Sequence, residues 1–294
     1  MKKYFLGWYF KNTNKNSYLA IIPGIAISGK EKHAFIQVIT DKESFYVNYD
    51  YAEFKHSEKP FFVKIGKSYF SLEKVILDIE SCDLKLEGEL NYKNHILPKT
   101  SLLSPSIMGP FSYLPSMQCK HGILSMKHDV EGKITLNNKV MNFKNSNGYI
   151  EMDSGRSFPK KYIWLQGNDF KNGNVSLMLA IATIPYLCIN FTGLISNLYI
   201  NGKEYRFATY NNSKIETMKK EKNKYFVKLK NSKYKLETTI IAKEGKPLKA
   251  PVGGKMKHTI KETLGCVIKI KLRDKKDNLI YSGTSKQGGF EWQY

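Results

Sequence analysis

Few cysteines and no long apolar run set the first limits on this chain. The 294 residues include 4 cysteines and no CxxC pair, so a disulfide framework is not expected, and we predict reduced, buried thiols. The longest apolar stretch, 175–188, is interrupted by Ser176, Thr183 and Pro185 and falls short of the roughly 18 residues that span a bilayer. The start, MKKYFLGWYFKN, lacks a small-residue cleavage site. We expect a cytoplasmic protein, with peripheral contact at an anionic membrane as the alternative.

Signature motifs of several enzyme classes are also absent. The sequence contains no GxGxxG, GxxxxGK[ST], HExxH or GxSxG, which disfavours nucleotide use, zinc proteolysis and α/β-hydrolase chemistry. Cys119 and His121 lie close together, but no second ligand cluster follows them. We therefore predict no metal and no cofactor.

Acidic residues are scarce relative to basic ones. Lysine and arginine total 47 against 26 acids, a net charge of +21 that would suit nucleic acid or acidic lipid headgroups. Five of the lysines, however, are spaced one or more residues apart along 224–235, a pattern typical of solvated strand faces: Lys224, Lys228, Lys230, Lys233 and Lys235. We expect no nucleic-acid partner, and a flat response of binding to salt would exclude one.

Alternating apolar and polar side chains dominate what is present. This period of two predicts strands in IQVIT (36–40), KLEGELNYK (85–93), GKITL (132–136), KVMNF (139–143) and CVIKIKL (266–272). Asn-Asn, Asn-Gly and Asn-Ser pairs between strand-like runs predict hairpins at 137–138, 201–202 and 231–232. The best helix candidate is SLEKVILDIE (71–80), although its valine and isoleucines fit a strand as well.

The pattern predicts an all-β protein with few helices, built as two β-barrel or sandwich halves. The proline-rich region 97–120 is the predicted boundary, giving an N-terminal half at 1–110 and a C-terminal half at 111–294. Because 97–120 is also rich in large apolar residues, we interpret it as an ordered crossover that could line a cavity. No repeat at a fixed period is visible.

Several segments resemble the tocopherol cyclase-like family, in the same order along the chain. They are GWYFK (7–11), HAFIQVI (33–39), IMGPFSYLPSMQCKHGILSMKH (107–128), GYIEMDSGRSFPKKYIWLQGNDF (148–170), FTGLI (191–195) and EYRFATY (204–210). The resemblance implies two lipocalin-like (calycin-type) β-barrels. It also implies an intramolecular cyclase, which closes a chromanol ring by adding a phenol oxygen across a prenyl double bond. Two departures, Ser154 in place of Trp and Leu6 in place of an acid, weaken the case that this reaction survives.

Acid-catalysed cyclisation needs a protonated carboxyl group, and burial in an apolar pocket raises the pKa of such a group. Glu151 and Asp153 are two residues apart, so they share one face of an extended strand. We interpret Asp153 as the candidate acid, Glu151 as its electrostatic partner and Arg156 as the orienting group. The structural alternative is ordinary turn chemistry, in which Asp153 caps a turn at Gly155 and Arg156 pairs with Glu151.

Other candidates come from the same segments. His121 could act as acid or base, or be a hydrogen-bonded structural residue. Trp8, Tyr9, Trp164 and Phe170 could offer π-faces to a cation or a quinol ring, or be core residues. Gln166 and Asn168 follow Trp164 at a spacing of two and would line a ligand site if that face points inward.

The first hypothesis is a protein that binds an amphipathic, prenyl-type small molecule in an apolar cavity and cyclises or isomerises it by acid catalysis without a cofactor. The second is a non-catalytic carrier or sensor of a hydrophobic ligand on the same scaffold. Loss of a cavity-wall aromatic at Ser154 is easier to reconcile with a carrier. The sequence does not define the ligand or the oligomeric state.

Overall fold

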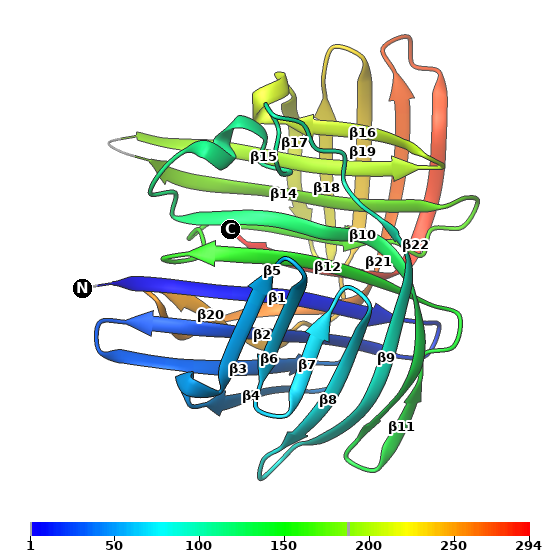
Figure 1. The fold of residues 1–294 in the computed structure, drawn as a ribbon. Coiled ribbons are helices and arrows are strands. Elements are labelled where there is room, and N and C mark those ends of the chain that lie inside the picture. Colours follow the sequence, from blue (N-terminus) through cyan, green and yellow to red (C-terminus); the bar gives the residue numbers. More distant parts are fainter. Residues whose placement is uncertain (1, 187–188) are drawn as a thin grey trace. The chain divides into compact units, whose positions relative to one another are not determined.

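The computed structural model describes residues 2–186 and 189–294, and it is built almost entirely of antiparallel strands (Figure 1). The strands of the first sheet are β1 (Lys3–Thr13), β2 (Tyr18–Ser28), β3 (Glu31–Ile39), β4 (Ser44–Tyr49), β5 (Phe54–Glu58), β6 (Phe61–Ile65), β7 (Ser68–Ser71), β8 (Lys74–Glu80), β9 (Lys85–Ile96), β10 (Cys119–Leu136), β11 (Lys139–Asn142) and β12 (Ser146–Gly155). Those of the second are β13 (Tyr162–Gly167), β14 (Val175–Tyr186), β15 (Ile189–Ile200), β16 (Lys203–Ala208), β17 (Lys214–Glu221), β18 (Lys224–Lys230), β19 (Tyr234–Ile241), β20 (Lys246–Val252), β21 (Lys255–Asp274) and β22 (Leu279–Gln293). Short 3₁₀ turns are η1 (Tyr51–Glu53), η2 (Gly109–Tyr113) and η3 (Thr209–Asn211).

The all-β prediction is confirmed, with two separate sheets. The first has the order β4-β3-β2-β1-β12-β10-β9-β8-β7-β6-β5, and β11 pairs with β10. The second has the order β16-β15-β14-β13-β22-β21-β19-β18-β17, and β20 pairs with β21. Both orders are open paths through the described residues, so the halves are curled sheets and not closed barrels. The described residues include no helix with the length and hydrophobicity to span a bilayer.

Two compact units form around these sheets. The first comprises residues 1–97, 123–158 and 248–259, and the second comprises 98–122, 159–247 and 260–294. Each unit is therefore assembled from three stretches of the chain. A boundary within 97–120 that separates independently folding halves stays a prediction.

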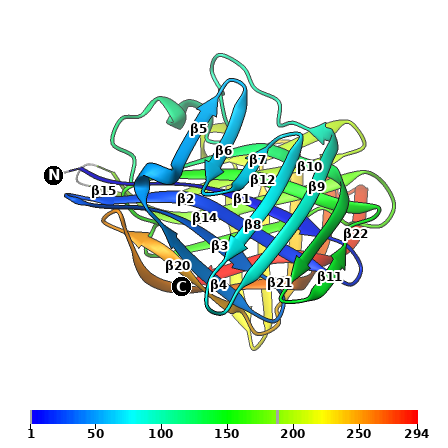
Figure 2. The same cartoon turned by 60° about the horizontal axis from the view of Figure 1, so that its bottom comes forward.

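Each sheet curls around its own hydrophobic cluster. In the first unit, Trp8 and Phe10 of β1 pack on the rings of Phe54, Phe61 and Phe70, which come from the other end of the sheet. Figure 2 shows β8 and β9 side by side in this sheet. In the second unit, Tyr225 of β18 packs on Phe290 and Trp292 of β22 in the same way. The cores consequently lie inside each sheet's curve.

The predicted hairpins are confirmed. Leu136 pairs with Lys139 across 137–138, and Ile200 pairs with Lys203 across 201–202. Asn137, Asn138 and Asn201 have positive φ angles, and Gly202 follows in the same way, as such tight turns require. Strands β18 and β19 join through 231–233. The turns at 137–138 and 201–202 were readable from two residues because positive φ is rare for other side chains.

The helix candidate at 71–80 was wrong. Residues Lys74–Glu80 form β8, which pairs with β7 and β9. Val75, Leu77 and Ile79 are buried while Asp78 and Glu80 are exposed, the alternation of a strand. The apolar spacing of this segment fits a helix or a strand, and its pairing with β7 and β9 makes it a strand.

The thiol prediction was only partly right. Cys266 is buried, Cys119 is half-buried and Cys82 is exposed, all three as free thiols. Cys188 lies outside the described residues.

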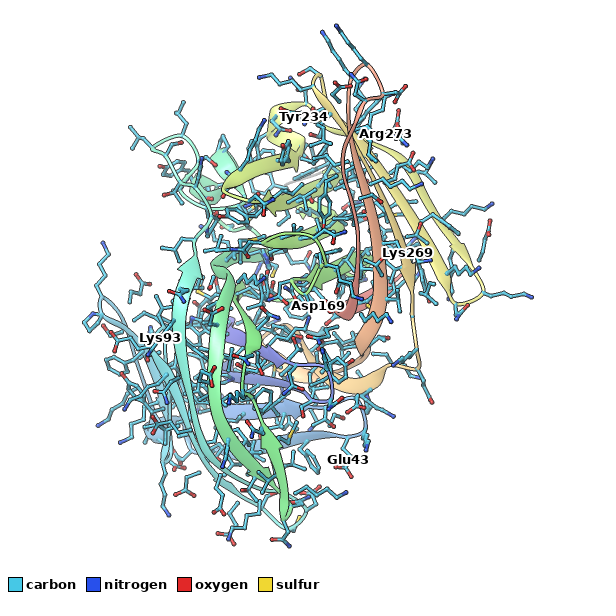
Figure 3. All side chains as sticks on the ribbon, turned by 90° about the vertical axis from the view of Figure 1, so that its right-hand side faces the viewer. Glu43, Lys93, Asp169, Tyr234, Lys269 and Arg273 are labelled. Atoms are coloured by element: carbon cyan, nitrogen blue, oxygen red, sulfur yellow. The ribbon has the colours of Figure 1, made fainter. Side chains whose placement is uncertain are left out.

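The solvated-lysine interpretation is confirmed at Lys228, which is exposed and pairs with Glu237. Figure 3 labels further cationic side chains among those projecting from the sheets, including Lys93 of β9 and Lys269 of β21.

Candidate functional site

Strand β12 presents the two predicted acids on the sheet face that points away from the hydrophobic cluster. Ile150 belongs to that cluster and Met152 packs against it, so the alternate side chains point the other way. These are Tyr149, Glu151 and Asp153. We call this side of β1 and β12 the acid face.

Strand β1 supplies the other half of the acid face. Its register places Gly7 opposite Asp153, Tyr9 opposite Glu151 and Lys11 opposite Tyr149. Directly opposed residues of an antiparallel pair point to the same side of the sheet. The glycine next to Asp153 is the one position here that brings no side chain.

Glu151 is buried and hydrogen-bonded. The residue is 5% exposed, and the hydroxyl of the fully buried Tyr149 donates to Oε2 at 2.5 Å. Burial raises the pKa of Tyr149 well above its ordinary value, and the adjacent charges of Glu151 and Asp153 raise it further. Tyr149 therefore remains a hydrogen-bond donor at every physiological pH. Asp153 is only half-buried.

Lys11 is a residue that the sequence reasoning missed. It is 1% exposed, which is rare for a lysine, and it lies beside Tyr149 in the register. The signal was available, because Lys11 follows Tyr9 at the strand period of two. The acid face thus combines a buried cation position with a buried carboxyl.

The segment that follows Gly155 has a structural role. Gly254 donates its N–H to the Arg156 carbonyl at 2.8 Å, and Gly253 donates to Ser157 Oγ at 2.8 Å. Arg156 itself is exposed, whereas Glu151 is buried. The role of Arg156 as the orienting group stays a prediction.

The other predicted residues divide between core and acid face. Trp8 lies in the hydrophobic cluster and stacks on Phe54, with 6.3 Å between the ring centroids. Tyr9 lies on the acid face. His121 is half-buried in β10, the strand next to β12 in the sheet order, and its backbone N–H donates to Met108 Sδ at 3.1 Å.

The positions of the two family departures are also defined. Leu6 is buried in the hydrophobic cluster, where an apolar side chain packs well and an acid would be desolvated. Ser154, directly opposite Leu6, shares a hydrogen bond with the hydroxyl of Tyr4. Burial raises the pKa of Tyr4, and the Ser154 bond partly offsets that rise. Ser154 thus has a structural partner of its own.

The second unit carries a corresponding arrangement. Along the sheet orders, β13 takes the place of β1 and β22 that of β12, so Glu291 lies opposite Trp164 as Glu151 lies opposite Tyr9. Glu291 accepts a short hydrogen bond from the Tyr162 hydroxyl. A further acid, Glu262 of β21, lies directly opposite Glu291 and is fully buried.

Sequence reasoning missed this group because its members are far apart in the chain. Trp164, Gln166 and Asn168, which the sequence analysis did single out, are all buried, and Gln166 lies opposite Gly289. Phe170 is instead in the hydrophobic cluster. The last strand in sequence of each sheet, β12 or β22, therefore carries a buried glutamate with a tyrosine hydroxyl bonded to it.

Comparison with known proteins identifies the family. The family model described as tocopherol cyclase-like matches residues 2–292, so this chain belongs to the tocopherol cyclase-like family. No curated protein matches the sequence significantly.

Solved structures share the fold. A crystal structure of CghA and one of CghA with Sch210972 have TM-scores of 0.58 and 0.60 at 9% identity. A kievitone hydratase from Nectria haematococca has a TM-score of 0.51 at 10% identity. Each comparison covers 99% of this chain and 88% of the other. At such identities the likeness concerns the fold alone.

Proposed function

We propose that this protein binds an amphipathic prenyl-type small molecule and cyclises or isomerises it by acid catalysis, with Glu151 as the proton donor. The observation that carries the proposal is a buried carboxyl, hydrogen-bonded to Tyr149, on a sheet face that points away from the hydrophobic cluster. Burial disfavours the charged form of a carboxyl group, and a protonated carboxyl is what alkene protonation needs. Membership of the tocopherol cyclase-like family supports the reaction class.

The proposed reaction balances without a cofactor. The Glu151 carboxyl gives its proton to the prenyl double bond, which leaves a tertiary carbocation and a carboxylate. The phenol oxygen of the substrate attacks the cation, forms the C–O bond and loses its proton to that carboxylate. Tyr149, which donates to Oε2, stabilises the carboxylate between the two proton transfers. The product is an isomer of the substrate.

Relative to the sequence-based hypothesis, the proposal exchanges the two acids. Glu151 becomes the donor because it is the more buried, and Asp153 becomes its electrostatic partner. Arg156 has no role in it. Trp164, Tyr9 and His121 remain candidate ligand or proton contacts, and a cytoplasmic location stays a prediction.

The test is turnover of geranylhydroquinone, followed by chromatography and mass spectrometry for an isomer of equal mass. Glu151→Gln should abolish product formation while leaving binding of the substrate within a few-fold of wild type. Asp153→Asn should slow the reaction less. Glu87→Gln, an exposed acid of β9 in the same unit, is the matched control and should turn over normally.

The carrier hypothesis predicts a different outcome. Its structural support is the loss of an aromatic at Ser154 and of an acid at Leu6, both now engaged in structural contacts. Binding of geranylhydroquinone by wild type with no isomer formed would favour a carrier. Full turnover by Glu151→Gln would refute Glu151 as the acid.

A further inference from the structure

The second sheet also has a face that points away from its hydrophobic cluster, and one row of residues crosses four of its strands. Gln166 of β13 lies opposite Met178 of β14, Met178 opposite Asn197 of β15, and Asn197 opposite Arg206 of β16. The neighbours of Asn197 along β15 that belong to the cluster, Leu198 and Leu194, point to the other side. We call this row and its flanking residues the amide face.

Asn197 is the unusual member of the row. It is fully buried, and among the described residues neither its Nδ2 nor its Oδ1 has a hydrogen-bond partner. An amide buried in this state costs on the order of 1–3 kcal/mol of stability, because the bonds it would make to water are lost. A donor and an acceptor held ready side by side are suited to a group that can complete both bonds.

The surroundings indicate what kind of group that is. Met178 and the adjacent Ile195 are apolar. The Arg206 guanidinium is already engaged, since NH2 donates to Glu204 Oε2 at 3.0 Å and to the Lys99 carbonyl at 2.8 Å. Its charge is therefore compensated within the unit and is not offered to an anionic ligand. A neutral hydroxyl on a mainly apolar molecule fits both features.

The crossover closes one end of this face. Arg206 NH1 donates to Ser104 Oγ at 3.1 Å, and the Tyr210 hydroxyl donates to the Ile107 carbonyl at 3.1 Å. Gly109 lies against the Tyr210 ring so closely that an added Cβ would be 2.6 Å from it. The segment from Lys99 to Gly109 is thus anchored to β16 and its end. This agrees with the prediction of an ordered crossover.

We infer that Asn197 recognises the neutral hydroxyl group of an apolar, phenol-type ligand beneath this crossover. The amide Oδ1 accepts the ligand's O–H and Nδ2 donates to the same oxygen. The inference deepens the proposed function and rests on it for the ligand class. It does not depend on which residue supplies the proton.

The experiment compares binding of geranylhydroquinone and its dimethyl ether by calorimetric titration. Wild type should bind the hydroquinone about 5-fold more tightly than the ether, which cannot donate, since a hydrogen bond contributes roughly 1 kcal/mol. Asn197→Leu keeps the branched shape of the side chain and should reduce this ratio to near 1. It should also leave the urea midpoint of the unliganded protein unchanged or raised, because it removes two unpartnered polar atoms.

Thr238→Val is the matched control. Thr238 is buried with an unpartnered Oγ1, but it lies opposite Val227 and Ile270 and so faces the hydrophobic cluster. The urea midpoint of Thr238→Val should be unchanged or raised, as in Asn197→Leu. Its ratio of hydroquinone to ether affinity should equal that of wild type. A preserved ratio in Asn197→Leu, a clear fall in its urea midpoint, or no saturable binding by wild type would each overturn the inference.

Failure of the proposed function gives a different result. If Glu151→Gln retains turnover, the acid is wrongly assigned, but the ratio of the two affinities still reports on Asn197. If the ratio test fails while Glu151→Gln loses turnover, the acid stands and the amide face is structural.

Discussion

Tyr149→Phe isolates the hydrogen bond on which the acid face depends. The substitution removes one hydroxyl and keeps the ring, so no cavity forms in the packing. What is lost is the donor to Glu151 Oε2, 2.5 Å away, in a place where both side chains are buried. A buried acceptor left without its donor costs about 1–3 kcal/mol. We expect the free energy of unfolding to fall by about 2 kcal/mol.

A matched variant sets the scale. Tyr92 is also fully buried in the first unit, and its hydroxyl donates to the neutral Asn12 Oδ1 at 2.8 Å. Tyr92→Phe makes the same chemical change next to an uncharged acceptor, so it should cost about 1 kcal/mol. The difference between the two variants measures the contribution of the carboxyl.

The assay is urea denaturation followed by tryptophan fluorescence, with Tyr149→Phe, Glu151→Gln and the double variant forming a thermodynamic cycle. A coupling energy of about 1 kcal/mol or more is expected, since residues in direct contact are not additive. Single effects that add to within about 0.5 kcal/mol would show that the bond does not stabilise the carboxyl, and the reasoning would fail.

Three further outcomes are expected. Burial and the nearby His95 hold the pKa of His128 well below its usual 6.5, so the unfolded chain takes up a proton that the folded chain does not. Stability should therefore fall as pH drops below about 6.5, and His128→Gln should flatten the acid limb of urea midpoint against pH. Gly148→Ala should destabilise by about 1–3 kcal/mol, measured the same way, because the new Cβ would lie 1.9 Å from His128 Nε2. Arg156→Ala should leave stability within about 0.5 kcal/mol and turnover of geranylhydroquinone unchanged, whereas a large loss of turnover would restore Arg156 to the site.

The sequence predicted those features that depend on the conformation of a few neighbouring residues, such as tight turns. The Asn137-Asn138 and Asn201-Gly202 turns were readable because few residues tolerate positive φ. The segment 71–80 was not, since its apolar spacing suits a strand or a short helix equally until the neighbours β7 and β9 are known. Trp8 and Tyr9 were treated alike in the sequence analysis, because strand alternation puts neighbouring side chains on opposite faces but does not show which face meets the core.

The candidate site was predictable only where its members lie close in sequence. Glu151 and Asp153 were found together because a spacing of two fixes a shared face. Tyr162 and Glu291 are 129 residues apart, and only the pairing of β13 with β22 brings them together. The burial of Asn197 depends on where a whole sheet points its second face, which no window of sequence contains.

The two buried glutamates occupy equivalent places in the strand order, yet they obtain their tyrosines differently. Glu151 accepts from Tyr149 on its own strand, whereas Glu291 accepts from Tyr162 on the neighbouring strand. The position in β22 that corresponds to Tyr149 is Gly289. Both buried carboxyl groups therefore accept a hydrogen bond from a tyrosine hydroxyl, although the tyrosines come from different positions. This is expected, because a buried carboxyl group needs a hydrogen-bond donor. The tyrosine bond alone therefore indicates burial, and what distinguishes Glu151 as the proposed acid is the chemistry around it. Both glutamates have a second acid nearby, Asp153 for Glu151 and Glu262 for Glu291. Of the two, Glu151 alone has a buried lysine, Lys11, two positions along the opposing strand, where the equivalent residue for Glu291 is Gln166.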